Sequence, residues 1–251
     1  MLKKRIIPIQ LFSESRLLKT KQFNDPRDVG DPVMSSKVYS SQDADELILL
    51  DIQRKNRSIS QLIKIAEQIN EQCFVPLTIG GGINTLENAE SLIKVGADKI
   101  LVNSVAYKNP DLITQIANSA GRQAVVVGID VMKIDGEYQL FSSCGKKAEY
   151  VNLTQHLKKV IESGAGEIMI QSIDQDGMMK GYDLELLDLV SNHCDVPIII
   201  AGGAGKFQDL HDALINGASA VACGSLFNFG DNNPLRAKAF LKNLGVPLKN
   251  I

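Results

Sequence analysis

Short apolar runs alternate along this chain with longer stretches in which apolar residues recur at helical spacing. Runs of Val, Ile and Leu without interspersed polar residues are typical of strands that are covered on both faces. Helical spacing is present at 59–70, 86–95 and 210–216. An Asp-Gly pair at 135–136 predicts a hairpin after the fifth run. The apolar runs predict eight strands, at 6–7, 47–50, 77–79, 100–102, 124–127, 168–170, 198–200 and 220–222.

The second half of the chain repeats the first at an offset of 121 residues. The segment 75–82 returns as 196–203, and Gly96-Ala97 returns as Gly217-Ala218. This unit is too long for a solenoid repeat, and two copies do not make an array. Eight strand–helix units in 251 residues have the size of a (β/α)8 barrel. We therefore predict an α/β fold, a single TIM barrel domain over 1–251 built from half-barrels at about 1–122 and 123–251. A doubly wound open sheet is the alternative, but it gives no reason for a repeat at half the length.

Composition narrows the functional class. The chain is 44% hydrophobic and 22% charged, which is typical of a globular protein with one core. No signal peptide or membrane segment is evident, so we expect a cytoplasmic protein. The four cysteines form no C-x-x-C pair and the three histidines show no ligand spacing, so we expect free thiols, no metal and no cofactor. A net charge of −2 without a basic patch argues against nucleic acid or a membrane as partner and favours a small substrate.

Glycine and hydroxyl residues follow four of the predicted strands, at the end of the barrel that carries its chemistry. Backbone N–H groups near helix starts favour a phosphate there. Matching sets occur in both halves, so we expect two phosphate grips on opposite sides of one mouth and a substrate with a phosphate at each end. Alternatively, the glycines serve only tight turns. The first-half grip consists of Gly81, Gly82, Asn103 and Ser104, and the second-half grip of Gly202, Gly203, Gly224 and Ser225.

Asp130 is the strongest acid–base candidate, because it ends an apolar run. A carboxylate there stands at the mouth between apolar walls, where desolvation raises its pKa toward values useful for proton transfer. Asp51, Asp174 and Asp176 also follow strands, but each could instead cap a helix or bind loop N–H groups. The approximate half-repeat counterpart of Asp130 is Leu11, so the sequence has no second carboxylate at that position.

An ordered set of motifs resembles the cyclase subunit (HisF) of imidazole glycerol phosphate synthase, from Arg5 to about Phe229. That family is a (β/α)8 barrel that takes ammonia from a glutaminase partner. It uses the ammonia to cleave and cyclise a doubly phosphorylated ribulosyl carboxamide of histidine and purine metabolism, a substrate that fits the two grips. The motifs are Arg5-Ile6-Ile7-Pro8, Asp28-Val29-Gly30-Asp31-Pro32, Asp45-Glu46-Leu47, Leu50-Asp51-Ile52, Ile79-Gly80-Gly81-Gly82-Ile83, Gly128-Ile129-Asp130, Ser172-Ile173-Asp174-Gln175-Asp176-Gly177, Gly181-Tyr182-Asp183 and Ala201-Gly202-Gly203-Ala204-Gly205.

The resemblance implies catalytic roles for Asp130 and for Lys19, which we place in a long, mobile first loop. One position departs from the family: where the family reads Pro-Cys-Leu-Asp-Val, this chain reads Pro-Ile-Gln-Leu-Phe at 8–12. Leu11 cannot transfer a proton, and loss of one member of an acid–base pair costs about 10²–10⁴-fold in rate. We assign substrate binding to Asp51, Gln171, Asp176 and Gly177, although Gln171 stands where the family usually has threonine.

Four charged residues lie near the starts of predicted strands, at the end of the barrel that we call the floor: Arg5, Glu46, Lys99 and Glu167. Their alternating signs suit a paired ring, because an unpaired buried charge is very costly. By resemblance they match the family's gate, through which ammonia passes from a glutaminase docked beneath. Asp98 matches a residue that contacts that partner. The alternative is a structural salt-bridge network at the stability face of the barrel.

Two functional hypotheses follow, and we prefer the first. The chain also resembles divergent HisF-like proteins associated with acetamidino sugar formation in surface polysaccharide (lipopolysaccharide) biosynthesis, which share an uncharged end of the first strand. There the barrel would form a heterodimer with a HisH-like glutaminase and pass ammonia to a sugar amidotransferase. The second hypothesis is a cyclase-lyase of histidine biosynthesis that uses Asp130 with Lys19 or water. A phosphosugar isomerase of the same superfamily is a third, weakened by Leu11 and by the charged set.

Overall fold

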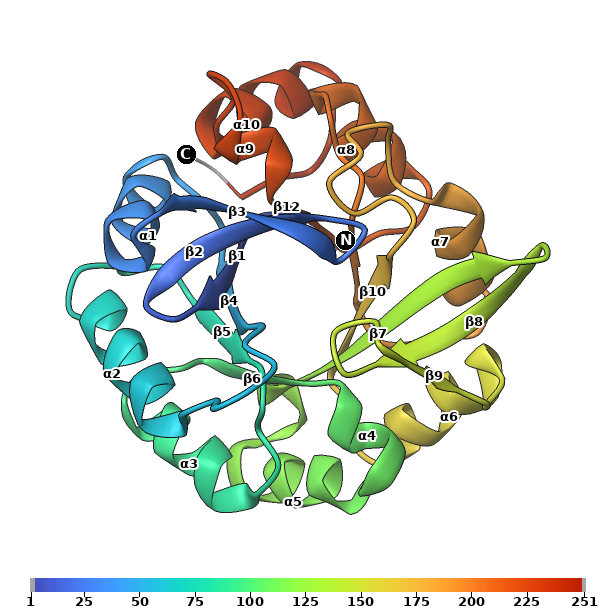
Figure 1. The fold of residues 1–251 in the computed structure, drawn as a ribbon. Helices are drawn as coiled ribbons and strands as arrows, with labels where there is room; N and C mark the ends of the chain where they lie inside the picture. Colours follow the sequence, from blue (N-terminus) through green and yellow to red (C-terminus); the bar gives the residue numbers. More distant parts are fainter. Residues whose placement is uncertain (1–2, 250–251) are drawn as a thin grey trace.

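The computed structural model describes residues 3–249. Within them, eight parallel strands form a closed barrel, because β10 pairs with β11 on one side and with β7 on the other. Figure 1 shows these strands around one axis, with the helices outside them. The predicted TIM barrel is confirmed, and each predicted strand overlaps one of its strands. These are β1 (Arg5–Ser13), β4 (Leu47–Asp51), β5 (Leu77–Gly80), β6 (Lys99–Val102), β7 (Val125–Ile134), β10 (Glu167–Ser172), β11 (Ile198–Ala201) and β12 (Ala220–Cys223).

Helices follow the strands, and local capping explains where several begin. α2 (Ile59–Asn70) has the predicted bounds and starts after Ser58, whose hydroxyl accepts the N–H of Gln61. α3 (Leu86–Lys94) and α8 (Phe207–Ile215) also lie where helical spacing predicts them. The others are α1 (Pro32–Ser41), α4 (Ser104–Lys108), α5 (Asp111–Ala120), α6 (Leu153–Glu162), α7 (Leu184–Ser191), α9 (Ser225–Asn228), α10 (Pro234–Asn243) and the 3-10 turn η1 (Arg122–Ala124).

The apolar residues form two cores. A large one lies between the strands and the surrounding helices. A smaller one fills the barrel interior and includes Ile7, Ile48, Leu101, Val126 and Met169. Successive strand residues point to opposite faces, so each strand contributes to both cores. This is why the strands appear in the sequence as continuous apolar runs.

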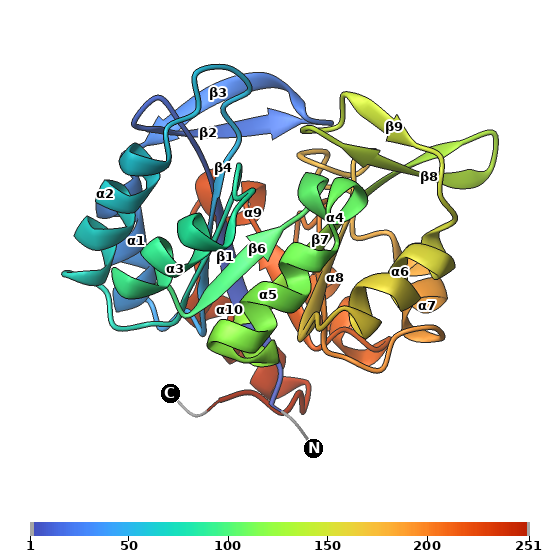
Figure 2. The same ribbon diagram turned by 90° about the horizontal axis from the view of Figure 1, so that it is seen from below.

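Two hairpins extend beyond the barrel at the same end, as Figure 2 shows. β7 continues into β8 (Glu137–Ser142) through the predicted Asp135-Gly136 turn, and β9 (Lys147–Glu149) adds to it. The other hairpin, β2 (Arg16–Lys21) and β3 (Asn24–Gly30), occupies the segment predicted as a long loop. That prediction was wrong, because the strands carry little apolar pattern and their turn at Gln22-Phe23 has positive φ without glycine.

Two further observations concern partners and ligands. In the part of the chain that the structure describes, no helix is long and apolar enough to span a membrane. Nor does any group of three or more His, Cys, Asp or Glu side chains within residues 3–249 have metal-binding geometry.

A buried cation ties the last helix to the first strands. The side chain of Lys238 in α10 is fully buried, and its Nζ lies 2.8 Å from carboxylates of both Asp43 and Asp45. The Asp45 carboxylate also accepts the backbone N–H of Ile6 at 2.8 Å. Lys238 therefore holds α10 against the beginnings of β1 and β4.

We expect Lys238→Met to lower the free energy of unfolding by about 3–5 kcal/mol, because it leaves buried carboxylate unpaired. Urea denaturation measures this loss. Lys242→Met changes the same helix at an exposed position and should shift stability by no more than about 0.5 kcal/mol. Equal urea midpoints for both variants would show that the ion pairs of Lys238 make no net contribution to the free energy of unfolding.

Candidate functional site

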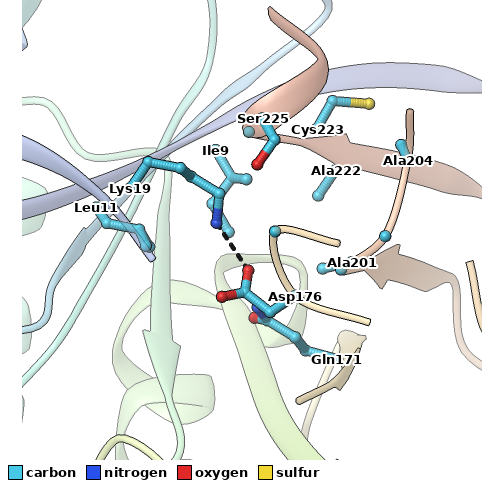
Figure 3. Close-up of a pocket in the computed structure, with 14 residues that line it drawn as sticks. Ile9, Leu11, Lys19, Gln171, Asp176, Ala201, Ala204, Ala222, Cys223 and Ser225 are labelled. Carbon is cyan, nitrogen blue, oxygen red and sulfur yellow. Dashed lines mark hydrogen bonds and ion pairs between the residues drawn. The ribbon is translucent and has the colours of Figure 1, made fainter. Parts of the chain in front are cut away.

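A cavity opens at the carboxyl ends of the barrel strands, which form the mouth. Apolar side chains of Ile9, Leu11 and Ala222 line it from β1 and β12. Lys19 comes from β2, and Figure 3 shows it directed across the cavity to Asp176. All four members of the second-half grip line the same cavity: Gly202, Gly203, Gly224 and Ser225. The structure thus brings these predicted residues together with Lys19 and Asp176.

The second-half grip presents polar groups to this cavity. Among the described residues, the buried Ser225 hydroxyl has no hydrogen-bond partner. A buried polar group without a partner is costly, so a ligand or ordered water is expected beside it. Gly203 has a φ of 118°, and a side chain there would collide with the carbonyl of Gly181. The turn therefore requires glycine at this position whether or not phosphate binds.

The first-half grip does not line this cavity. Its Asn103 amide donates to Asp130 at 2.9 Å, and its Ser104 hydroxyl accepts the N–H of Ser143 at 2.9 Å. The side chain of Arg57 lies against Gly82. The sequence predicts two equivalent grips in one mouth; in the structure they differ, because protein groups cover the first and leave the second open.

Asp130 lies at the mouth on β7 and is buried, as the sequence predicts. The pKa of its carboxyl is raised to about 7, mainly by burial; the hydrogen bond from Asn103 opposes this rise, and the nearby charge of Asp176 adds to it. A carboxyl that titrates near neutral pH is populated both as acid and as base, which is the requirement for general acid–base chemistry.

Strand register identifies the residue that occupies the matching position in the first half. Leu11 pairs with Leu50 between β1 and β4, and Asp130 pairs with Gln171 between β7 and β10. Because Leu50 and Gln171 are 121 residues apart, Leu11 is the register counterpart of Asp130. The mouth therefore has a carboxyl on one wall and an alkyl group at the equivalent place on the other.

Lys19 is not in a loop but in β2, where it is buried. Its ammonium group lies 2.7 Å from the Asp176 carboxylate, which also accepts the Thr20 hydroxyl at 2.7 Å. Gly177 has a φ of 72° and packs against the carbonyl of Thr20. Asp176 thus fastens the β2–β3 hairpin over the mouth. Gln171 lines the cavity beneath this contact.

Asp51 lies at the end of β4, where it does not line the cavity but is close to Gly81 of the first-half grip. Its carboxylate accepts the N–H of Gln53 at 2.7 Å, and the Arg57 Nε lies 3.4 Å away. Burial raises the pKa of Asp51, while both contacts oppose that rise. Its bond to a loop N–H matches the structural alternative considered from sequence. Asp174 does the same with the N–H of Lys133 at 2.7 Å.

The four charged residues of the floor form a closed ring. Glu46 accepts from Arg5 at 2.7 Å and from Lys99 at 2.8 Å. Glu167 accepts from the same two cations at 3.2 Å each. Thr78 adds a hydroxyl bond to Glu46 at 2.6 Å. Asp98 is exposed beside Lys99, and its carboxylate accepts the N–H of Leu77 at 2.8 Å. The predicted alternating ring is present.

Sequence reasoning missed Arg57. It lies between β4 and α2 in a polar segment, 53–58, that matches no motif. The available signal was its charge: Arg54, Lys55 and Arg57 fall within four residues just after a strand end. From composition alone, such a cluster is expected to be a solvated loop. The contact between Arg57 and Gly82 is visible only in the folded chain.

With this geometry established, comparison with known proteins identifies the family. Residues 6–233 match the family described as histidine biosynthesis protein. The chain belongs to this family. It is 39% identical over 252 residues to imidazole glycerol phosphate synthase subunit HisF of Hyphomonas neptunium, with 100% of both chains covered. The subunit HisF of Thermotoga sp. is 41% identical over 249 residues, which cover 99% of this chain and 98% of the relative.

These relatives confirm the resemblance to the HisF family over the full length. A third, the subunit HisF of Chloroherpeton thalassium, is 40% identical over 250 residues, which cover 99% of this chain and 100% of the relative. The names of these HisF relatives favour the cyclase-lyase hypothesis over the acetamidino sugar hypothesis that we prefer from sequence.

Asp130 should make stability depend on pH in a direction set by its raised pKa. The folded state favours the protonated carboxyl of Asp130. The stability that this protonation contributes is fully present below the ordinary pKa of an aspartic acid, 3.8, and is lost as the pH rises through about 7. At roughly 1.4 kcal/mol per pKa unit the loss reaches about 4 kcal/mol. We expect Asp130→Asn to remove this pH dependence of stability.

Urea unfolding at about pH 5 and about pH 8 measures this difference, with the wild-type chain and Asp130→Asn compared at each pH. The wild type should lose more stability than the variant between the two conditions. A parallel pH dependence in both proteins would mean that Asp130 titrates in its ordinary range.

Proposed function

We propose that this HisF-family barrel receives ammonia through its floor from a glutaminase subunit and uses it at the mouth, as an imidazole glycerol phosphate synthase cyclase-lyase. The observation that carries the proposal is the arrangement along one barrel axis: a closed ring of charges at the floor and the buried Asp130 at the opposite end. The apolar interior between them suits neutral ammonia, because ammonium would lose its hydration there.

The mouth supports the chemistry of a doubly phosphorylated ribulosyl carboxamide. Asp130 can take a proton from the attacking nitrogen as a base and return it to a leaving group as an acid, since its pKa is about 7. The ammonium of Lys19 supplies positive charge beside the second-half grip, whose Ser225 hydroxyl has no hydrogen-bond partner within residues 3–249. One phosphate of the substrate would bind there.

A second candidate is ammonia delivery to a sugar amidotransferase that forms acetamidino sugars of surface polysaccharides. Leu11 is the observation that favours it, because an alkyl group occupies the register counterpart of Asp130 and lines the cavity. In this function the barrel still pairs with a HisH-like glutaminase, and the acceptor reacts elsewhere. The phosphosugar isomerase hypothesis gives the floor ring no purpose, and we do not propose it.

Turnover of the ribulosyl substrate by the purified chain with saturating ammonium salt distinguishes the two candidates without a glutaminase. A cyclase-lyase predicts turnover that Asp130→Asn lowers about 10²–10⁴-fold, the range for loss of a general acid or base. Leu11→Asp is the matched variant, since it adds a carboxyl at the register counterpart.

No turnover by the wild-type chain, with activity gained in Leu11→Asp, would sink the cyclase-lyase proposal and favour ammonia delivery. Turnover that survives in Asp130→Asn would instead remove the assigned role of Asp130. Far-ultraviolet circular dichroism of each variant checks that the barrel is intact.

A further inference from the structure

A cation lies against a glycine in each of the two grips. In the second-half grip, a side chain added at Gly224 would meet the Lys19 Cε at 3.2 Å. In the first-half grip, one added at Gly82 would meet the Arg57 Nη1 at 3.0 Å and its Nε at 3.1 Å. Glycine at both positions therefore leaves room for a positively charged side chain beside the backbone.

A carboxylate accompanies each cation. Lys19 pairs with Asp176, which follows β10, and Arg57 pairs with Asp51, which ends β4. β4 and β10 are equivalent strands, because Leu47 and Ile168 are separated by the 121-residue offset. The same set of groups, a glycine, a serine hydroxyl, a cation and a carboxylate, thus occurs at both grips.

The sequence repeat does not account for the two cations. At an offset of 121 residues, Arg57 corresponds to Met178, and Lys19 corresponds to Leu140. Lys19 comes from the hairpin after the first barrel strand, whereas Arg57 comes from the loop after the second. Each grip therefore receives its positive charge from a different segment of the chain. This favours a requirement for positive charge at both grips.

Arg57 also has capacity to bind an anion. Its side chain is 30% exposed, and its contact with Asp51 is a single long one of 3.4 Å. Guanidinium carries five N–H donors in a planar fork that matches phosphate, so the contacts with Asp51 and Cys144 leave donors for a ligand. Arg57 lies near Cys144, whose neighbour Ser143 donates to the Ser104 hydroxyl. The cation and the grip hydroxyl are thus on the same side of the mouth.

We propose that Arg57 is the phosphate-binding cation of the first-half grip and is the counterpart of Lys19 in the second. It would neutralise a phosphate monoester there together with Gly82 and Ser104. This inference rests on the proposed function only in assuming a substrate with two phosphates. Arg57 would thus be the residue that selects a phosphate at the first-half grip.

Residue-resolved NMR titration with inorganic phosphate tests this directly, because the amide signals of Gly82 and Ser104 report one grip and those of Gly203 and Ser225 the other. We expect Arg57→Gln to weaken phosphate binding at Gly82 and Ser104 about tenfold or more, the usual effect of losing a charge-assisted hydrogen bond. Binding at Gly203 and Ser225 should not change.

Three further variants test whether the effect depends on net charge, on the grip and on the guanidinium group. Arg54→Gln removes the same charge from the same exposed loop, where Arg54 donates to the Phe23 carbonyl at 3.0 Å, and should leave both grips unchanged. Lys19→Met should show the mirror result, with binding lost at Gly203 and Ser225. Arg57→Lys should keep part of the affinity, because charge remains without the planar fork.

An equal loss in Arg54→Gln and Arg57→Gln would overturn the inference, since net charge alone would then explain it. So would unchanged binding at Gly82 in Arg57→Gln. Neither result bears on ammonia, so the proposed function would stand. Absence of phosphate binding at both grips of the wild-type chain would reject the inference together with the two-phosphate substrate.

Discussion

Pairing of β7 with β10 closes the sheet, and the positions of all site residues depend on it. The register sets Val126 inside the barrel, Val127 and Ile129 against the helices, and Asp130 at the mouth. A slip of one residue would exchange these faces and move the carboxyl out of the mouth. Because all eight barrel strands run in parallel, their starts meet at the floor and their ends at the mouth. Closure thus separates the charged ring from Asp130 along one axis.

The charged ring is not explained by stability alone. Two cations and two carboxylates at the floor must lose hydration, and a packed apolar layer of similar volume is often as stable or more so. Each carboxylate in the ring contacts both cations, so the charges are well compensated. Compensation reduces the cost of the ring without giving a reason for its presence. Passage of a small polar molecule through the floor gives such a reason, and in the proposed function that molecule is ammonia.

The sequence predicts the barrel well because strands buried on both faces leave an unambiguous apolar pattern. The β2–β3 hairpin leaves none: β3 has the sequence of a polar loop, and its pairing with β2 is set by backbone bonds and by Asp176 from the other half of the chain. The difference between the two grips was also beyond prediction. It depends on where the Arg57 side chain packs, and a repeat of glycines contains no information about the loop that covers them.

The absence of a carboxyl at the register counterpart of Asp130 constrains both functional candidates. Asp130 can serve in turn as base and acid, but only toward atoms on the β7 side of the mouth. The opposite wall, with Ile9 and Leu11, can exclude water but cannot move a proton. A two-sided proton transfer therefore needs a group of the substrate, water, or Lys19 released from Asp176. Since that ion pair also fastens the hairpin, proton transfer by Lys19 would be coupled to opening of the mouth. Delivery of ammonia to another protein needs no such coupling, which is why Leu11 is the residue on which the choice between the two functions depends.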